Sequence, residues 1–218
     1  MLKFQCLVLD HDDTVVRSTS TVNYPGIRLA MQQLRPELSF TAEQYAAWNF
    51  LPGFQSLLSD IWKLTPEEQA WAYDQWLQYA MVHMPPIFDG FDRLLQRHHE
   101  AGGKIAVISH SSRDNILRDY RSQIGLEPDL IFGWDLPAEH RKPHPYPLEE
   151  TMRRLSLPPE QLLMVDDLKP GLDMARACGV PFAGAGWGND LPQVEAYLRA
   201  NSDYYFKSVN AFEEFLFG

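Results

Sequence analysis

The stretch CLVLDHDDTVV, residues 6–16, joins an apolar run to three carboxylates within four positions. The apolar run predicts a buried β-strand, and Asp10, Asp12 and Asp13 follow directly at its tip. Carboxylates held a few ångströms apart disfavour one another's ionisation, and a purely structural role gives no reason to crowd them. The cluster therefore predicts a bound cation. We expect magnesium, a hard ion that takes oxygen ligands and bridges to substrate phosphates.

Composition and charge limit the class of protein. The chain has 218 residues, of which 45% are hydrophobic and 22% are charged, which is typical of a globular protein. Its net charge of −10 disfavours nucleic acid and anionic membranes as partners. No apolar run approaches the ~20 residues of a membrane span, and the first run is too short for a signal peptide. We therefore expect a cytoplasmic protein in which Cys6 and Cys178 are reduced core thiols.

Short apolar runs alternate with helical patterns in the second part of the chain, which predicts an α/β fold with a parallel sheet covered on both faces. The strands expected after the first are KIAVIS, LIFG, LLMVD and PFAGA, at residues 104–109, 130–133, 162–166 and 181–185. Between the first two strands, from about Tyr24 to His83, the pattern is helical, with aromatic residues and few β-branched ones, which predicts an all-helical insert.

The clearest helix of this insert begins after Thr65. Thr65 and Glu68 have the spacing of a capping box, and Pro66 suits the first turn. One face of this helix is predicted to pack against its neighbours. Its residues are Tyr73, Trp76, Leu77, Ala80, Met81 and Met84.

Polar residues end three of the predicted strands, namely Asp10, Ser109 and the pair Asp166 and Asp167. Ligands of parallel α/β sheets bind beyond the carboxyl ends of the strands, so we expect these side chains at one edge. Lys142 lies in the loop HRKPHPYP before the strand that ends in Asp166. A lysine beside crowded carboxylates balances their charge.

These residues resemble the motifs of the haloacid dehalogenase-like superfamily. LVLDHDDTVV is similar to its first motif, Asp-x-Asp-x-Thr, and MVDDLKPGLDMARACG to its fourth, while Ser109 and Lys142 match the second and third. The fourth motif and the C-terminal tail resemble the phosphoglycolate phosphatase and β-phosphoglucomutase branch. The resemblance implies a Rossmann-like core from residues 1–16 and 86–218, with a helical cap from residues 17–85.

The resemblance implies a Mg²⁺-dependent phosphatase that hydrolyses a small phosphorylated metabolite through an aspartyl-phosphate intermediate. Asp10 would be the nucleophile and Asp12 the general acid and base. Thr14 would orient Asp12 or its loop. Ser109 would donate a hydrogen bond to a phosphoryl oxygen, and Lys142 would balance the charge of Asp10 and the phosphoryl group.

The resemblance also implies a set of magnesium ligands. Asp10 and Asp167 would bind the ion directly, together with the backbone carbonyl of Asp12. Asp166 would act on the metal or through its waters. Asp13 stands where the family most often has glycine. Aspartate tolerates the left-handed geometry of a tight turn better than most residues, and strand alternation favours such a turn over a role as an outer ligand.

Other polar residues near these motifs are weaker candidates. His110 and Arg113, which follow Ser109, are possible substrate contacts. His11 lies between two aspartates and is expected to face away from them in a packing or loop role. Asn23 and Arg28 of the insert are candidates for reading the leaving group, although a structural role is favoured for both.

Other functions are compatible with parts of this pattern. A phosphosugar mutase uses the same residues and stays open as an alternative. A non-catalytic phosphate sensor is a last alternative, disfavoured because no motif residue is missing. A dehalogenase is disfavoured because that branch generally lacks a counterpart of Asp12. A phospho-receiver domain is disfavoured because its acidic pair precedes the phosphorylated aspartate. We expect a monomer or homodimer.

Overall fold

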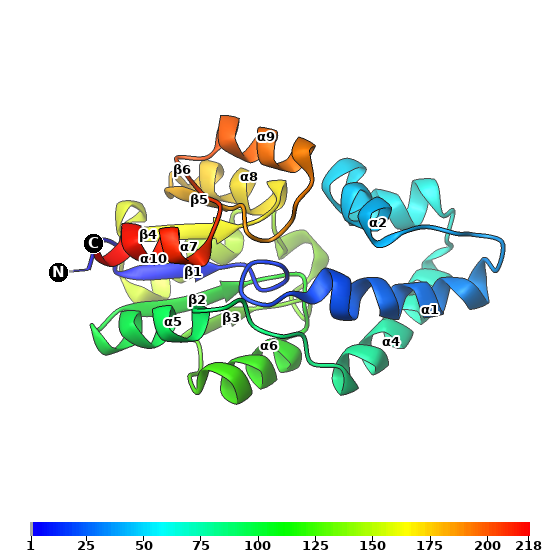
Figure 1. Cartoon of the computed structure of the whole chain (residues 1–218), viewed down its shortest axis with the longest axis horizontal. Helices are drawn as coiled ribbons and strands as arrows, with labels where there is room; N and C mark the ends of the chain where they lie inside the picture. Colours follow the sequence, from blue (N-terminus) through cyan, green and yellow to red (C-terminus); the bar gives the residue numbers. More distant parts are fainter. Residues whose placement is uncertain (1) are drawn as a thin grey trace. The chain divides into compact units, whose positions relative to one another are not determined.

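The computed structural model describes residues 2–218, and its sheet confirms the predicted α/β class. Six parallel strands lie in the order β3-β2-β1-β4-β5-β6 (Figure 1). Their bounds are β1 Cys6–Leu9, β2 Lys104–Ile108, β3 Leu130–Phe132, β4 Leu162–Asp166, β5 Phe182–Ala185 and β6 Tyr204–Phe206. The strands belong to one compact unit, residues 2–16 and 87–218, here called the core unit. Residues 17–86 form a second unit, here called the helical unit.

Strand β1 lies at the centre of the sheet and pairs in parallel with both β2 and β4. Its four residues are fully buried, as an apolar strand covered on both faces must be. The ladder continues one residue beyond two of the strands, because the N–H of Asp10 donates to Val165 O at 2.9 Å and that of Ser109 to Phe132 O at 3.0 Å. These bonds fix the positions of Asp10 and Ser109 at the carboxyl edge of the sheet.

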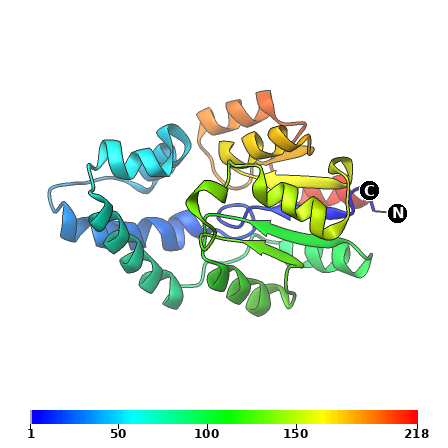
Figure 2. The same ribbon diagram turned by 180° about the vertical axis from the view of Figure 1, so that it is seen from behind.

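Helices cover both faces of the sheet. Their bounds are α5 Phe91–Glu100, α6 Arg113–Asp119, α7 Tyr146–Leu155, α8 Lys169–Cys178, α9 Pro192–Asn201 and α10 Val209–Phe217. Alternate strand residues, among them Leu7 and Leu9, pack with α5, α6 and α10 in one buried cluster. Helix α10 lies in front of the sheet in Figure 1, and α7 lies in front of it in the reverse view of Figure 2.

The core unit is closed where the chain leaves and re-enters it. Val16 and Ile87 form an isolated antiparallel bridge, and the N–H of Phe88 donates to Val15 O at 3.0 Å. The two crossings of the chain therefore lie side by side, although 70 residues separate them in sequence.

Both cysteines are free thiols, as predicted. Cys6 is buried in β1, where burial raises the pKa of its thiol to about 12. Cys178 is partly buried at the end of α8, and burial raises its pKa to about 11. Both groups therefore remain protonated and unreactive at neutral pH.

The helical unit has its own buried aromatic and aliphatic cluster. Its elements are η1 Thr19–Asn23, α1 Tyr24–Leu34, α2 Ala42–Trp48, η2 Asn49–Gly53, α3 Phe54–Ser56, η3 Leu57–Ile61 and α4 Pro66–Val82. Asn23 is used structurally, because it accepts from Trp76 Nε1 at 3.1 Å and donates to Ser18 Oγ. Arg28 is exposed on α1. Within residues 2–218, no helix combines the length and apolarity that a membrane crossing requires.

The predicted start of α4 is confirmed. The Thr65 hydroxyl accepts from the N–H of Glu68 at 3.3 Å, and the Glu68 carboxylate accepts from the N–H of Thr65 at 2.9 Å. Pro66 occupies the first turn, where its missing N–H leaves no bond unmade.

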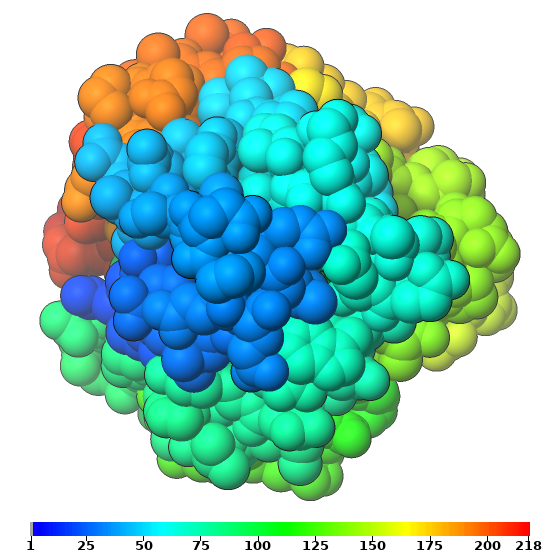
Figure 3. Space-filling model, turned by 90° about the vertical axis from the view of Figure 1, so that its right-hand side faces the viewer, coloured from blue at the N-terminus to red at the C-terminus, as the bar shows by residue number. Residues whose placement is uncertain are grey.

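The predicted packing face of α4 is confirmed only in part. Ala80 is buried and Trp76 contacts Gly26 of α1, as predicted. Met81 and Met84 are 64% and 46% exposed, and the buried residues of the helix are Ala72 and Ala80. The cause is the close approach of α1, which Figure 3 shows beside α4 at the surface, α1 in blue and α4 in teal. Gly26 of α1 lies under the rings of Trp76 and Tyr79, so a residue without a side chain lets α1 approach two aromatic residues of α4.

A larger side chain at Gly26 should therefore destabilise the helical unit. A Cβ there would lie 3.1 Å from Trp76 Cδ1 and 3.2 Å from Tyr79 Cδ1. We expect Gly26→Val to lower the free energy of unfolding by about 1–3 kcal/mol through overpacking, as measured by denaturant unfolding. Leu29→Val, at an exposed position of the same helix, controls for the helix propensity of valine. Equal stability of the two variants would contradict this packing.

Candidate functional site

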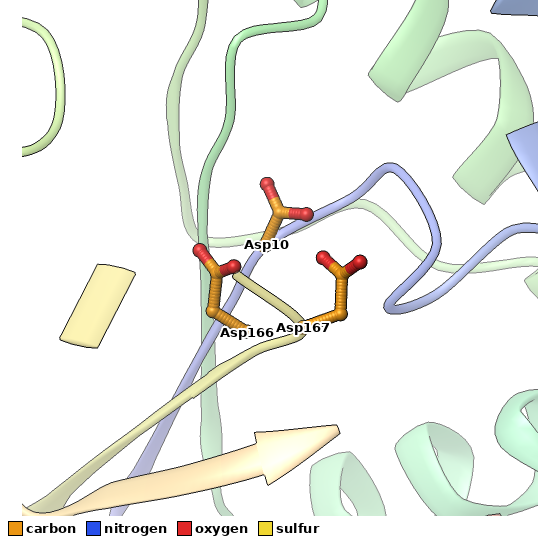
Figure 4. Close-up of side chains that lie close together, drawn as sticks. All are labelled: Asp10, Asp166 and Asp167. Atoms are coloured by element: carbon orange, nitrogen blue, oxygen red, sulfur yellow. The ribbon is translucent and has the colours of Figure 1, made fainter. Parts of the chain in front are cut away.

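Three carboxylates meet at the carboxyl edge of the sheet. Asp10 follows β1, while Asp166 ends β4 and Asp167 follows it. All three are buried, and one oxygen of each lies within 4.8 Å of the others (Figure 4). The pairing of β1 with β4 brings these carboxylates together, although more than 150 residues separate Asp10 from the other two. We refer to them as the acidic triad.

Lys142 lies against the acidic triad. Its ammonium donates to Asp10 Oδ1 at 2.5 Å and to Asp166 Oδ2 at 2.7 Å, and the lysine is 7% exposed. Burial lowers the pKa of this ammonium, but the two carboxylates outweigh burial and raise it above its usual value. Lys142 is therefore charged, and three ionised carboxylates with one ammonium leave a net charge of −2.

The acidic triad holds more negative charge than Lys142 balances. Burial, followed by the charge of Asp10, raises the pKa of Asp166 to about 6, even though Lys142 opposes the shift. Burial and the neighbouring carboxylates Asp166, Asp13 and Asp10 raise the pKa of Asp167 well above its usual value. The raised pKa values show that ionising all three carboxylates is costly without a cation. A buried set of oxygen donors that carries a net charge of −2 when fully ionised fits a hard divalent cation such as Mg²⁺.

The position of Asp166 is closely constrained. Its Oδ1 accepts from the N–H of Leu168 at 2.8 Å, and its Oδ2 accepts from Lys142. Helix α8 passes so near that a Cβ on Gly171 would lie 2.2 Å from Asp166 Oδ2. The glycine of the fourth motif is therefore required because this carboxylate occupies the space of a side chain.

The predicted phosphate-binding serine lies beside the central strand. Ser109 is 3% exposed and follows β2, the neighbour of β1, at the same edge as Asp10. Its hydroxyl accepts from the N–H of Ser111 at 3.2 Å. The hydroxyl proton is thus free to donate to an incoming oxygen atom.

Asp12 and Thr14 belong to the loop after β1 but not to the acidic triad. Asp12 pairs with Val16 in a short parallel bridge, so a tight turn follows the strand. Thr14 is fully buried, and its hydroxyl has no hydrogen-bond partner within residues 2–218. Its carbonyl accepts from Trp187 Nε1 at 2.9 Å. The roles expected for Asp12 and Thr14 stay predictions.

His11 faces away from the edge, as predicted for a packing role. It is 1% exposed, and its Nε2 lies 3.1 Å from Asp119 Oδ2 in α6. Its ring stacks on Tyr120 with centroids 6.0 Å apart. His11 therefore ties the loop after β1 to α6.

The two candidate substrate contacts lie in different settings. His110 donates from Nε2 to Lys142 O at 2.9 Å, and burial together with the charge of Lys142 lowers its pKa to about 4. It is therefore neutral at physiological pH and holds the backbone of the lysine loop. Arg113 is exposed at the start of α6, and the structure shows no contact between it and the acidic triad. Substrate contact by either residue stays a prediction.

Residues 187–189 contact the edge and were missed by the sequence analysis. Trp187 donates to Thr14 O, Gly188 lies against Asp13 and Asp167, and Asn189 Nδ2 lies 3.4 Å from Asp167 Oδ2. The signal available was their place directly after β5, because polar residues beyond strand ends line such sites.

Asp13 occupies the turn that was predicted for it. Its φ is 55°, in the left-handed region that aspartate tolerates better than most residues. Strand alternation does not extend to Asp13, because the backbone leaves the extended conformation there. Its charge nevertheless raises the pKa of Asp167, so the turn lies within electrostatic reach of the acidic triad.

Neutralising Asp13 should leave metal binding nearly intact. Asparagine also tolerates the left-handed region, so Asp13→Asn removes the charge and keeps the turn. We expect the metal-free protein at pH 7 to become more stable in denaturant unfolding, because a charge that opposes ionisation of Asp167 is lost. Asp74→Asn, exposed on α4, removes the same charge elsewhere. A loss of about tenfold or more in Mg²⁺ affinity would instead give Asp13 the role of an outer ligand.

Metal binding at the acidic triad should weaken in acid. Asp166 must be ionised to bind a cation, and its pKa of about 6 means that protons compete below that pH. We expect the affinity for Mn²⁺, measured by electron paramagnetic resonance, to fall as pH decreases from 7 to 5, by about tenfold per unit for each displaced proton. Asp166→Asn should bind Mn²⁺ more weakly and with a flatter pH profile. An affinity unchanged between pH 7 and 5 would contradict this expectation.

Comparison with known proteins confirms the resemblance to the family. A model of haloacid dehalogenase-like hydrolases matches residues 4–179. A phosphoglycolate phosphatase of Xanthomonas campestris pv. campestris is 32% identical over 107 residues, which cover 48% of each chain. The chain spans about half the length of the curated relatives it matches.

Solved structures share the fold. A haloacid dehalogenase-like hydrolase from Bacteroides fragilis superposes with a TM-score of 0.82 at 22% identity, covering 96% of this chain and 100% of that one. A predicted phosphoglycolate phosphatase from Haemophilus somnus reaches 0.79 at 18% identity, covering 99% of each chain. At these identities the likeness establishes the fold alone.

Proposed function

The chain belongs to the haloacid dehalogenase-like hydrolases, and from this membership we propose that it is a magnesium-dependent phosphatase of small phosphorylated metabolites. The observation that carries the proposal is the contact of Lys142 with both Asp10 and Asp166 in a buried triad of carboxylates. Lys142 places a positive charge directly beside the proposed carboxylate nucleophile, and a bound divalent cation would add to it, which suits attack on a negatively charged phosphoryl group.

Asp10 is the nucleophile in this proposal. Its Oδ1 accepts from Lys142, which leaves Oδ2 to attack phosphorus in line. The bond from phosphorus to the leaving oxygen breaks as the aspartyl phosphate forms, and Asp12 gives a proton to the departing alcohol. Water then attacks the phosphoryl group while Asp12 takes its proton, which releases inorganic phosphate and restores the Asp10 carboxylate.

The remaining edge residues bind and neutralise the phosphoryl group. Ser109 donates its hydroxyl to a phosphoryl oxygen, and the Lys142 ammonium lies beside the charge that develops. Asp10, Asp166 and Asp167, with the carbonyl of Asp12, would hold Mg²⁺. The ion, when bound, neutralises charge on the phosphate and on the acidic triad.

The helical unit is proposed to be the cap that selects the substrate. It has a buried core separate from that of the sheet, so its surface can vary without altering the acidic triad. Cytoplasmic location and a monomeric or homodimeric state stay predictions.

The proposal is tested by separating Asp10 from Asp12. The wild-type protein should hydrolyse p-nitrophenyl phosphate with Mg²⁺ and lose this activity with a chelator. Asp10→Asn should form no phosphoryl-enzyme in acid-quench trapping, because the nucleophile is absent. Asp12→Asn should still capture the phosphoryl group but turn over about 10²–10⁴-fold more slowly, because proton transfer is lost. Asp114→Asn, an exposed carboxylate of α6, is the control.

Three results would contradict the proposal. Labelling of a residue other than Asp10 would remove its nucleophilic role. No turnover across a broad panel of phosphate esters with Mg²⁺ would favour the phosphate sensor. Retention of the phosphoryl group in water, with transfer to a sugar phosphate, would favour the mutase.

A further inference from the structure

We propose that the loop after β5, residues 187–189, positions the metal centre, with Asn189 orienting Asp167 and Trp187 holding the loop that carries Asp10 and Asp12. This inference rests on the proposed function, because it concerns the same acidic triad. It assigns to three consecutive residues a role that none of the four sequence motifs contains. The loop contacts both chain segments that supply the carboxylates.

Trp187 is a fixed support for the loop after β1. Its ring packs against Phe91 of α5 and Phe212 of α10, with centroid distances of 6.0 and 5.7 Å. Its Nε1 donates to Thr14 O at 2.9 Å, within the loop that begins at Asp10. Because the indole is packed against two helices, it holds that carbonyl at a defined position.

Gly188 lets the loop after β5 lie directly against the segments that contain Asp13 and Asp167. A Cβ at this position would lie 2.1 Å from Asp13 O and 2.9 Å from Asp167 Cβ. No side chain fits such a space, so the backbone of Gly188 itself lies against both segments. The distance from the loop after β5 to Asp167 is therefore fixed by direct contact.

Asn189 is positioned to orient the Asp167 carboxylate. Its Oδ1 accepts from the N–H of Leu191 at 3.3 Å, which assigns the two ends of the amide. Nδ2 therefore faces Asp167 Oδ2, 3.4 Å away. A neutral donor suits a carboxylate that already lies near Asp166, Asp13 and Asp10, because it restricts rotation without adding charge.

The consequence is a ligand oriented before the metal arrives. Groups that bond to a metal ligand restrict its orientation, and their loss typically costs about 10–100-fold in metal affinity. Asn189 is thus a positioning residue that acts through Asp167. A purely structural role would instead affect folding alone.

Asn189→Ser separates these roles. Serine can accept from the N–H two residues on, so the turn at Leu191 is kept, but its hydroxyl is too short to reach Asp167. We expect Mn²⁺ affinity, measured by electron paramagnetic resonance on the full chain, to fall about 10–100-fold. The melting temperature of the metal-free protein should stay unchanged. The matched control is Asn210→Ser, since Asn210 Nδ2 donates to the exposed Glu214 in α10.

The outcomes distinguish this inference from the proposed function. If the wild-type protein binds no Mn²⁺, the proposed function fails. If the wild type binds and Asn189→Ser binds equally well, or loses only thermal stability, the positioning role is overturned.

Trp187→Phe keeps the inference testable if Asn189→Ser does not fold. Phenylalanine preserves the packing on Phe91 and Phe212 but cannot donate to Thr14 O. We expect weaker Mn²⁺ binding at an unchanged melting temperature, because the loop that carries Asp10 is less constrained. Mn²⁺ affinity equal to wild type in this variant would overturn the role of Trp187.

Discussion

The contact of Lys142 with Asp10 and Asp166 is the interaction on which the rest of the core unit depends. Three buried carboxylates without a cation would carry a desolvation cost that a marginally stable protein does not sustain. The ammonium compensates part of this cost, and it does so only if three segments meet at one point. These segments are the ends of β1 and β4 and the loop before α7. The central position of β1 places Asp10 beside the end of β4, and the hydrogen bond from His110 to Lys142 O holds the lysine loop against them.

The sequence predicted those features that a periodic apolar pattern or a short sequence motif reveals. Apolar runs located the strands, and the polar residues at their ends located the edge, because parallel strands all point the same way. Asp10, Ser109 and the pair Asp166 and Asp167 were therefore assigned to one edge before any contact was known, and Lys142 was singled out in the loop before the strand that ends in Asp166. The turn at Asp13 was predicted from the tolerance of aspartate for left-handed geometry.

Features that depend on close approach between distant segments were not predicted. The buried face of α4 includes Ala72, which was not predicted, and leaves out Met81 and Met84, which were. The cause is the close approach of Gly26 of α1, which helical periodicity does not reveal. Asn189 was missed for a related reason. An amide in a loop has no periodic pattern, and its importance arises only from the carboxylate that the sheet brings beside it.

The bridge between Val16 and Ile87 bears on how such a protein can change over generations. A segment inserted between two adjacent residues of the core unit adds an entropic cost of loop closure that grows only slowly with the length of the segment. The segment of 70 residues between Val16 and Ile87 can therefore become longer or shorter, or be replaced, during evolution while β1 and β2 keep their pairing. The two units can therefore evolve at different rates. The core unit can keep its acidic triad while the sequence of the helical unit changes.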